Sequence, residues 1–257
     1  MSRYIVSIIP ARGGSERLPR KNVATFCGKP LITWSILQSV NSLYVDRTFV
    51  ITDDLEISDI SKSYGAEVLI QPPWQCRLGT MGGTTAVINA TGQLEEQKVP
   101  LTDFVLLLPN YPLRKPDDID RIVAEHVRRN AINSNAVAPM RHIALQQEDA
   151  PGHVTPVLGG NNGVYLSAGC LLTVSAFDAW RKSLFGIGPI SVDDYIRHRT
   201  KPLPITGEAS RIYVEEWQTQ EIDYYYELRI CETLMWDNIL SLSNVYDEYG
   251  SRKLFEE

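Results

Sequence analysis

Short apolar runs alternate with amphipathic segments along the first part of this 257-residue chain. The run from Tyr4 to Ile9 is followed by a candidate helix that begins near Pro30, and then by a second run from Thr48 to Ile51. A second candidate helix stops at Gly65, just before a third run over residues 66–70. Strands separated by helices are typical of parallel βαβ units, in which helices cover the faces of the sheet. The alternation therefore predicts an α/β fold with a mainly parallel, twisted sheet flanked by helices.

The later part of the chain continues the same pattern. Residues 104–108 are all apolar, which is typical of a central strand covered on both faces. Residues 71–83, rich in glycine, proline and threonine, are predicted to form a loop. We expect further strands at 135–140 and 170–174, and helices at 84–94, 117–127, 175–182 and 221–235. In the last helix an apolar or aromatic residue recurs every four positions from Ile222 to Leu234, and this spacing predicts its buried face.

One stretch interrupts the alternation. Between about residues 141 and 170 the pattern weakens, and Pro151, Pro156 and the pair Gly159-Gly160 break it further. No internal repeat, low-complexity tract or linker divides the chain elsewhere. We therefore expect a single domain over residues 1–257, with an inserted arm at about 141–170 that extends to a partner subunit.

Charge and cysteine usage exclude several classes of function. The net charge of −6 argues against a general binder of nucleic acids or membrane surfaces, because both attract an excess of basic residues. No signal peptide is recognisable, and no apolar run is long enough to span a bilayer. The widely spaced cysteines indicate buried thiols in a reducing compartment, not a disulfide framework or a zinc site. They are Cys27, Cys76, Cys170 and Cys231. We expect a cytoplasmic protein with no nucleic-acid or membrane partner.

A basic loop over residues 12–22 follows the first apolar run. Gly13 and Gly14 carry no Cβ, so the backbone there is able to turn and to approach a ligand closely. The four cations of the loop are Arg12, Arg17, Arg20 and Lys21. Cationic side chains and consecutive backbone N–H groups suit a polyphosphate, and a local basic loop on an acidic protein indicates a small anionic ligand. The alternative is a solvated basic loop, since the segment is neither a P-loop nor a G-x-G-x-x-G motif.

Residues 10–22, with Pro-Ala-Arg-Gly-Gly-Ser at one end and Leu-Pro-Arg-Lys-Asn at the other, resemble the signature of the acylneuraminate (CMP-sialic acid synthetase-like) cytidylyltransferases. The resemblance continues at residues 28–31, 52–54 and 106–114. Near the C-terminus, Glu221-Ile222-Asp223 and Glu232 match the spacing of the family's Asp-x-Asp and the Glu that follows it. The similarity spans residues 4 to about 235, and its first motif is the most specific.

The resemblance implies a Rossmann-like nucleotidyltransferase with an inserted dimerisation arm, acting as a homodimer. Such enzymes transfer CMP from CTP to the anomeric hydroxyl of a nine-carbon 2-keto sugar acid and release pyrophosphate. The nucleotide contacts that it implies are Ala11, Arg12, Gly13, Gly14, Ser15, Lys21, Asn22 and Gln71. The implied catalytic residues are Arg12, Lys21 and Asp223; the implied acceptor-binding residues are Asn110 and Arg114. The implied ligands of Mg²⁺ are Glu221 and Asp223.

Elementary chemistry agrees with these roles, although each has a structural alternative. Nucleotidyl transfer needs neutralised phosphate charge, a bridging metal and in-line placement of the acceptor hydroxyl. Glu221 and Asp223 offer the hard oxygen ligands that Mg²⁺ prefers, but carboxylates near a helix start also favour the helix dipole. Arg114 either contacts the acceptor or anchors its own turn, and residues 52–54 either place a ligand or cap a helix. His126 is expected to be a packing histidine.

Several departures from the family pattern leave the acceptor and the nucleotide open. Glu16 replaces a lysine, Gln71 replaces an arginine that helps to hold the base in many members, and Glu221 replaces an aspartate. Leu108 replaces a glutamine and Asn110-Tyr111 replaces Thr-Ser, and these two changes predict a reshaped pocket that suits a less polar or differently substituted acceptor. Besides a cytidylyltransferase for sialic-acid-like sugars, the alternatives are a relative with another acceptor or nucleotide, and a catalytically weakened nucleotide-binding protein.

Overall fold

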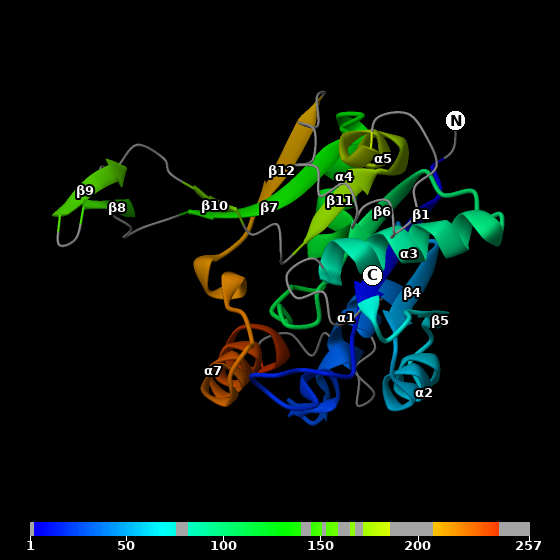
Figure 1. Cartoon of the computed structure of the whole chain (residues 1–257), viewed down its shortest axis with the longest axis horizontal. Helices are drawn as coiled ribbons and strands as arrows, with labels where there is room; N and C mark the ends of the chain where they lie inside the picture. Colours follow the sequence, from blue (N-terminus) through cyan, green and yellow to red (C-terminus); the bar gives the residue numbers. More distant parts are fainter. Residues whose placement is uncertain are drawn as a thin grey trace.

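A twisted eight-stranded sheet forms the centre of the molecule, in a computed structural model that describes residues 3–75, 82–139, 145–150, 153–158, 165–167, 172–185 and 208–241. Seven strands follow the order β10-β7-β11-β6-β1-β4-β5, and β12 pairs with β7. The strands are β1 (Ile5–Pro10), β4 (Arg47–Thr52), β5 (Glu67–Ile70), β6 (Asp103–Leu106), β7 (Asn133–Pro139), β10 (Tyr165–Ser167), β11 (Thr173–Ala176) and β12 (Ala209–Tyr213). Figure 1 shows the sheet running through the body of the protein.

The predicted mainly parallel sheet is confirmed. β1 pairs in parallel with both β4 and β6, β4 pairs in parallel with β5, and β12 pairs in parallel with β7. Only β10 and β11 run antiparallel to their neighbours among the strands of this sheet. Five of the six residues of β1 are buried, as expected for a strand covered on both faces.

Helices cover both faces of the sheet. The described α-helices are α1 (Leu31–Val40), α2 (Leu55–Ser63), α3 (Gly82–Glu96), α4 (Asp118–Arg128), α5 (Phe177–Phe185) and α7 (Tyr225–Met235). Apolar side chains of α1, α2 and α4 pack in one core cluster against one face, and those of α3 form a second cluster against the other, with α5 at its edge. All six helices were expected, with ends that differ by a few residues. The predicted sheet flanked by helices is therefore confirmed, as the amphipathic pattern indicated.

Helix α7 differs from the prediction in its start and in its buried face. The helix begins at Tyr225, so Ile222 precedes it. Leu228, Cys231 and Met235 are its buried residues, whereas Tyr226 and Ile230 are 60% and 50% exposed. A repeat of four drifts around a helix that has 3.6 residues per turn, so the expected stripe does not stay on one face. The structure instead selects the face that packs against Phe26 and α1.

The inserted arm is more regular than its sequence indicates. Strands β8 (Leu145–Ala150) and β9 (His153–Leu158) pair antiparallel as a two-stranded ribbon, separate from the main sheet. Figure 1 shows this ribbon projecting from the body beyond β7 and β10. Its role in dimerisation stays a prediction.

Two of the four cysteines lie in the described part of the chain. Cys231 is buried and Cys27 half-buried, and both are free. Burial is the main cause that raises the pKa of each thiol to about 12. Cys76 and Cys170 lie outside the described residues, as does most of the loop predicted at 71–83. None of the helices in the described ranges is long and apolar enough to cross a membrane.

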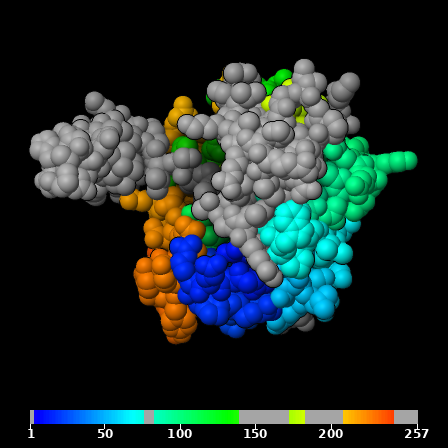
Figure 2. Space-filling view, in the orientation of Figure 1, coloured from blue at the N-terminus to red at the C-terminus, as the bar shows by residue number. Residues whose placement is uncertain are grey.

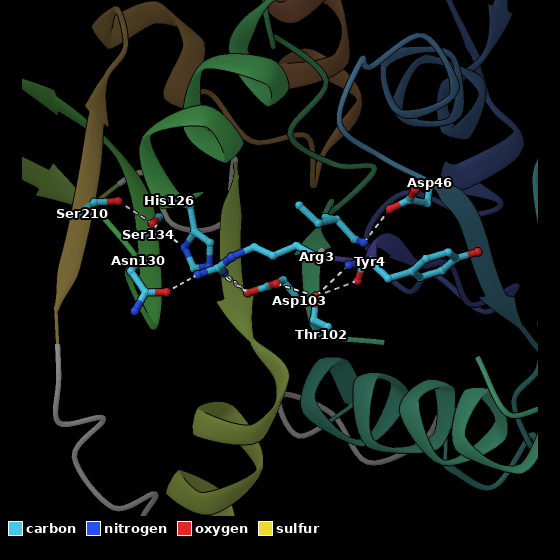
Figure 3. Close-up of polar contacts among 10 residues, drawn as sticks. Arg3, Tyr4, Asp46, Thr102, Asp103, His126, Asn130, Ser134 and Ser210 are labelled. Atoms are coloured by element: carbon cyan, nitrogen blue, oxygen red, sulfur yellow. Dashed lines mark hydrogen bonds and ion pairs between the residues drawn. The ribbon is translucent and has the colours of Figure 1, made fainter. Parts of the chain in front are cut away.

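A buried polar network lies at the amino-terminal end of β6 (Figure 3). His126 Nε2 lies 3.0 Å from Asp103 Oδ1, and its Nδ1 lies 2.7 Å from the hydroxyl of Ser134. Ser134 in turn lies 2.5 Å from the hydroxyl of Ser210, and Arg3 donates to Asp103 at 2.6 Å. His126 is fully buried, so it has the structural role expected of it. The network links β6, β7, β12 and α4.

Candidate active site

A pocket opens where β1 and β6 end, at the carboxyl edge of the parallel strands where α/β proteins place their ligands. Three segments line it: the basic loop after β1, the turn after β6 and the approach to α7. The lining residues are Pro10, Arg12, Ser15, Glu16, Arg17, Leu18, Lys21, Asn22, Leu108, Pro109, Asn110 and Asp223. On the surface, the N-terminal segment and the segment of α7 lie next to each other (Figure 2).

The conformation of the basic loop depends on a glycine at position 13. The Gly13 N–H donates to Asp53 Oδ1 at 2.8 Å, and a Cβ there would lie 2.5 Å from Asp54 Oδ2. Gly14 has open space around it, so only the first glycine is required by packing. The predicted nucleotide contacts Ala11 and Asn22 also hold the loop. Ala11 is buried and donates its N–H to the Ile51 carbonyl, while Asn22 Nδ2 donates to the Arg12 carbonyl at 2.9 Å.

Three of the four loop cations line the pocket, and Arg20 does not. Arg20 donates to Asp54 at 2.5 Å and also pairs with Glu56, on the side of α2. The hydrogen bond from Arg20 is the main cause that lowers the pKa of Asp54. Asp54 also caps α2 by accepting from the Ile57 N–H at 3.0 Å. The capping alternative for residues 52–54 therefore agrees with the structure, and Arg20 pairs with carboxylates outside the pocket that the other three loop cations line.

Asp223 meets two cations of the basic loop. Lys21 Nζ lies 2.7 Å from Oδ1, and Arg17 Nη2 lies 2.6 Å from Oδ2. Lys21 also donates to the Ile222 carbonyl at 2.8 Å. The Arg17 guanidinium lies 5.7 Å from the centre of the Tyr224 ring, and the Asp223 carboxylate is the main cause that raises the pKa of Arg17. The fold thus joins the predicted catalytic residues Lys21 and Asp223, which are 202 positions apart in the sequence.

Glu221 has different surroundings from Asp223. Asn110 Nδ2 donates to Glu221 Oε1 at 2.7 Å, and the hydroxyl of Tyr111 donates to Oε2 at 2.8 Å. Glu221 is not among the residues that line the pocket, whereas Asn110 is. The two carboxylates that were predicted to bind metal together are therefore each paired with other groups.

The donor chemistry fits Mg²⁺ through one protein carboxylate. No group of three or more histidine, cysteine, aspartate or glutamate side chains in the described ranges is arranged to hold a metal. Asp223 supplies a carboxylate at the pocket, and Mg²⁺ commonly takes one or two carboxylates together with water and phosphate oxygens.

Arg114 anchors the turn after β6 and does not reach the pocket. Its side chain is fully buried, and it donates to Ser35 Oγ, to Gln38 Oε1 and to the Leu108 carbonyl at 2.8–3.1 Å. Because Ser35 and Gln38 belong to α1, these bonds join the turn to that helix. These contacts agree with the structural alternative for Arg114, and its contact with the acceptor stays a prediction.

Gln71 is also absent from the pocket lining. It is 3% exposed and its N–H donates to the Thr52 carbonyl, which extends the pairing of β4 and β5 by one residue. The structure thus does not bring this predicted nucleotide contact to the other site residues. Arg17 does line the pocket, as expected of a cation in the basic loop. The lining residues that were not predicted as site residues are Pro10, Glu16, Leu18, Leu108 and Pro109.

Residues 6–158 match the family model described as cytidylyltransferase. The chain is 36% identical to the CMP-N,N'-diacetyllegionaminic acid synthase of Legionella pneumophila, over 84% of this chain and 94% of that protein. It is 33% identical to the pseudaminic acid cytidylyltransferase of Campylobacter jejuni, over 48% of this chain and 53% of that protein.

The fold is similar to that of a solved CMP:2-keto-3-deoxy-manno-octonic acid synthetase complexed with CTP. The TM-score is 0.64 and the sequence identity 16%, over 92% of this chain and all of that one. At that identity the likeness concerns the fold alone. The family model, however, matches more than half of the chain, and the Legionella relative matches it along most of its length. The chain therefore belongs to the cytidylyltransferase family of enzymes.

Proposed function

We propose that this enzyme transfers CMP from CTP to the anomeric hydroxyl of a sialic-acid-like 2-keto sugar acid and releases pyrophosphate. The observation that carries the proposal is one pocket in which Arg12, Arg17 and Lys21 lie with Asp223. The pocket lies at the carboxyl ends of β1 and β6, where a nucleotide is expected in an α/β sheet. The names of the relatives from Legionella and Campylobacter support an acceptor of the legionaminic or pseudaminic type.

The triphosphate of CTP competes with Asp223 for the loop cations. Arg17 and Lys21 each bind one oxygen of this carboxylate, and both are able to turn from it to phosphate oxygens. Charge-assisted hydrogen bonds to phosphate then replace charge-assisted bonds to the carboxylate. We infer that nucleotide binding releases Asp223 for another cation.

The chemical step forms a bond between the acceptor hydroxyl oxygen and the α-phosphorus. The bond from that phosphorus to the oxygen bridging the α- and β-phosphates breaks, pyrophosphate leaves with the bonding electron pair, and the hydroxyl proton passes to water. Arg12 and Lys21 neutralise the negative charge of the phosphates, and the pocket holds the two reactants in line. Mg²⁺ bound by Asp223 and phosphate oxygens would supply further charge neutralisation.

Two properties of the whole protein are also proposed. We expect a homodimer in which the β8–β9 ribbon reaches the partner subunit, and sedimentation at micromolar concentration tests it. A monomer at that concentration would contradict the dimer. We also expect the enzyme to act in the cytoplasm, since the described cysteines Cys27 and Cys231 are free thiols.

The experiment that tests the function is pyrophosphate release with Mg²⁺. Each of CTP, UTP, ATP and GTP is paired with N,N'-diacetyllegionaminic acid, pseudaminic acid, N-acetylneuraminic acid and 3-deoxy-manno-octulosonic acid. We expect turnover with CTP and at least one of the nine-carbon acids. Turnover only with another nucleotide or with the eight-carbon acid would favour a relative with different substrates. Nucleotide binding without turnover of any pair would favour a catalytically weakened binding protein.

A further inference from the structure

Three residues that depart from the family pattern contact one another beside the pocket. Asn110 and Tyr111 stand where the family has Thr-Ser, and Glu221 stands where it has aspartate. Asn110 Nδ2 donates to one oxygen of Glu221 at 2.7 Å, and the Tyr111 hydroxyl donates to the other at 2.8 Å. The Ile222 N–H donates to the Asn110 carbonyl at 2.8 Å, so backbone and side chains join the same two segments. The three departures form one structural unit.

The unit determines which end of the Asn110 amide faces the carboxylate. A carboxylate accepts hydrogen bonds and donates none, so the amide must turn its NH₂ toward Glu221. The carbonyl oxygen, Oδ1, is then at the opposite end. Within the described part of the chain, Oδ1 accepts no hydrogen bond, and Asn110 lines the pocket. Tyr111 occupies the second carboxylate oxygen and keeps Glu221 from rotating away from the amide.

We propose that Asn110 is a specificity-determining residue whose Oδ1 accepts a hydrogen bond from a hydroxyl or amide N–H of the acceptor. Glu221 and Tyr111 are positioning residues that orient the Asn110 amide, and Glu221 is not a ligand of the metal. This inference rests on the proposed function, because it assigns a role within the same pocket. When a protein oxygen is held in place as a hydrogen-bond acceptor, the site discriminates against a substrate analogue that lacks the matching donor. The protein oxygen is then left without a partner.

The first test separates positioning from metal binding. Glu221→Gln keeps the shape of the side chain but lets the Asn110 amide turn over, because a glutamine is able both to donate and to accept. With CTP present, Mn²⁺ binding is measured by electron paramagnetic resonance for the wild type, Glu221→Gln and Asp223→Asn. We expect Glu221→Gln to bind Mn²⁺ within about twofold of the wild type and Asp223→Asn to lose at least about tenfold. An equal loss in both variants would assign Glu221 to the metal and overturn the proposal.

The second test concerns the acceptor that the enzyme turns over. In Glu221→Gln we expect the KM for the acceptor to rise about tenfold, with the KM for CTP little changed. Tyr111→Phe should also raise the KM for the acceptor, by a smaller factor. Thermal unfolding of each variant shows whether it folds. A Glu221→Gln variant that folds and keeps the wild-type acceptor KM would contradict the positioning role.

Analogues of the acceptor identify the donor group. Each hydroxyl, and each amide N–H, is replaced in turn by a group that does not donate. We expect one replacement to lower kcat/KM about 10- to 100-fold in the wild type and to have little further effect in Asn110→Ala. If no position shows this coupling, Asn110 does not determine specificity. Absence of turnover in the wild type would instead refute the proposed function, while the Mn²⁺ measurement would still decide the role of Glu221.

Discussion

The two ends of the sheet carry polar clusters with opposite properties. At the amino-terminal end of β6, Asp103, His126 and Ser134 are at most 1% exposed and are hydrogen-bonded to one another in a chain (Figure 3). At the carboxyl end, the side chains of Arg17 and Asp223 are 57% and 14% exposed, and their ion pair opens into the pocket. Both clusters combine residues from distant parts of the chain.

The difference in burial explains the difference in role. A buried polar group that loses its partner is left with its desolvation penalty, so the Asp103–His126 network has one stable arrangement. In a half-exposed ion pair the attraction between the charges is nearly balanced by the hydration that they give up. Its members are therefore able to exchange one partner for another. We therefore expect substitutions in the buried network to change stability, and substitutions in the pocket to change activity.

The largest effect is expected from substitution of Lys21 or Asp223, which form an ion pair at the pocket. Lys21→Ala and Asp223→Ala should each lower kcat/KM for CTP by about 10²- to 10³-fold, because each removes preorganised charge from the reaction site. The measurement is pyrophosphate release, with unfolding followed by circular dichroism. Arg20→Ala is the matched control, since this cation of the same loop pairs with Asp54 and Glu56 outside the pocket. Wild-type turnover in either pocket variant would refute the mechanism.

A substitution in the buried network should lower stability and leave activity nearly unchanged. His126→Ala removes two hydrogen bonds and leaves Asp103 and Ser134 with fewer partners, so the free energy of unfolding should fall by about 3 kcal/mol. Urea unfolding measures the change. Well below its melting temperature, the variant should keep kcat/KM within about twofold. Loss of activity with unchanged stability would contradict the assignment of this network to the fold.

A third comparison lies within the basic loop. In Gly13→Ala the new Cβ would lie 2.5 Å from Asp54 Oδ2, so the loop or the cap of α2 must shift. We expect a loss of about 1–2 kcal/mol in unfolding free energy and weaker CTP binding in calorimetry. Gly14→Ala provides the control, because its Cβ meets no atom within 4 Å. Equal effects of the two substitutions would show that packing around Gly13 is not what shapes the loop.

The smallest effect is expected from the exposed partner of Asp223. Arg17→Ala should raise the KM for CTP by about two- to fivefold, because exposed ion pairs contribute little. The ratio of variant to wild-type KM should approach one as salt is raised, since salt screens the exposed charge in the wild type. A loss as large as that of Lys21→Ala would place Arg17 among the catalytic residues.

Much of the fold was predictable because its signals are local. The apolar runs of β1 and β4 and the stop of α2 at Gly65 each depend on residues that are neighbours in the sequence. The basic loop was predicted to bind a ligand for the same reason, and its residues line the pocket. The buried face of α7 was predicted wrongly, because Leu228, Cys231 and Met235 are buried by contacts with Phe26 and α1, far away in the chain.

The sequence by itself determined the α/β class, the parallel order of βαβ units and the place of a basic loop after the first strand, since these follow from periodicity and residue type. Only the tertiary structure decided which charges share the pocket. It turned Arg20 toward Asp54, enclosed Arg114 beside Gln38, and brought Lys21 to Asp223. The physical reason is that the long side chains of arginine and lysine are able to reach several partners. Packing between distant segments of the chain decides which partner lies nearest.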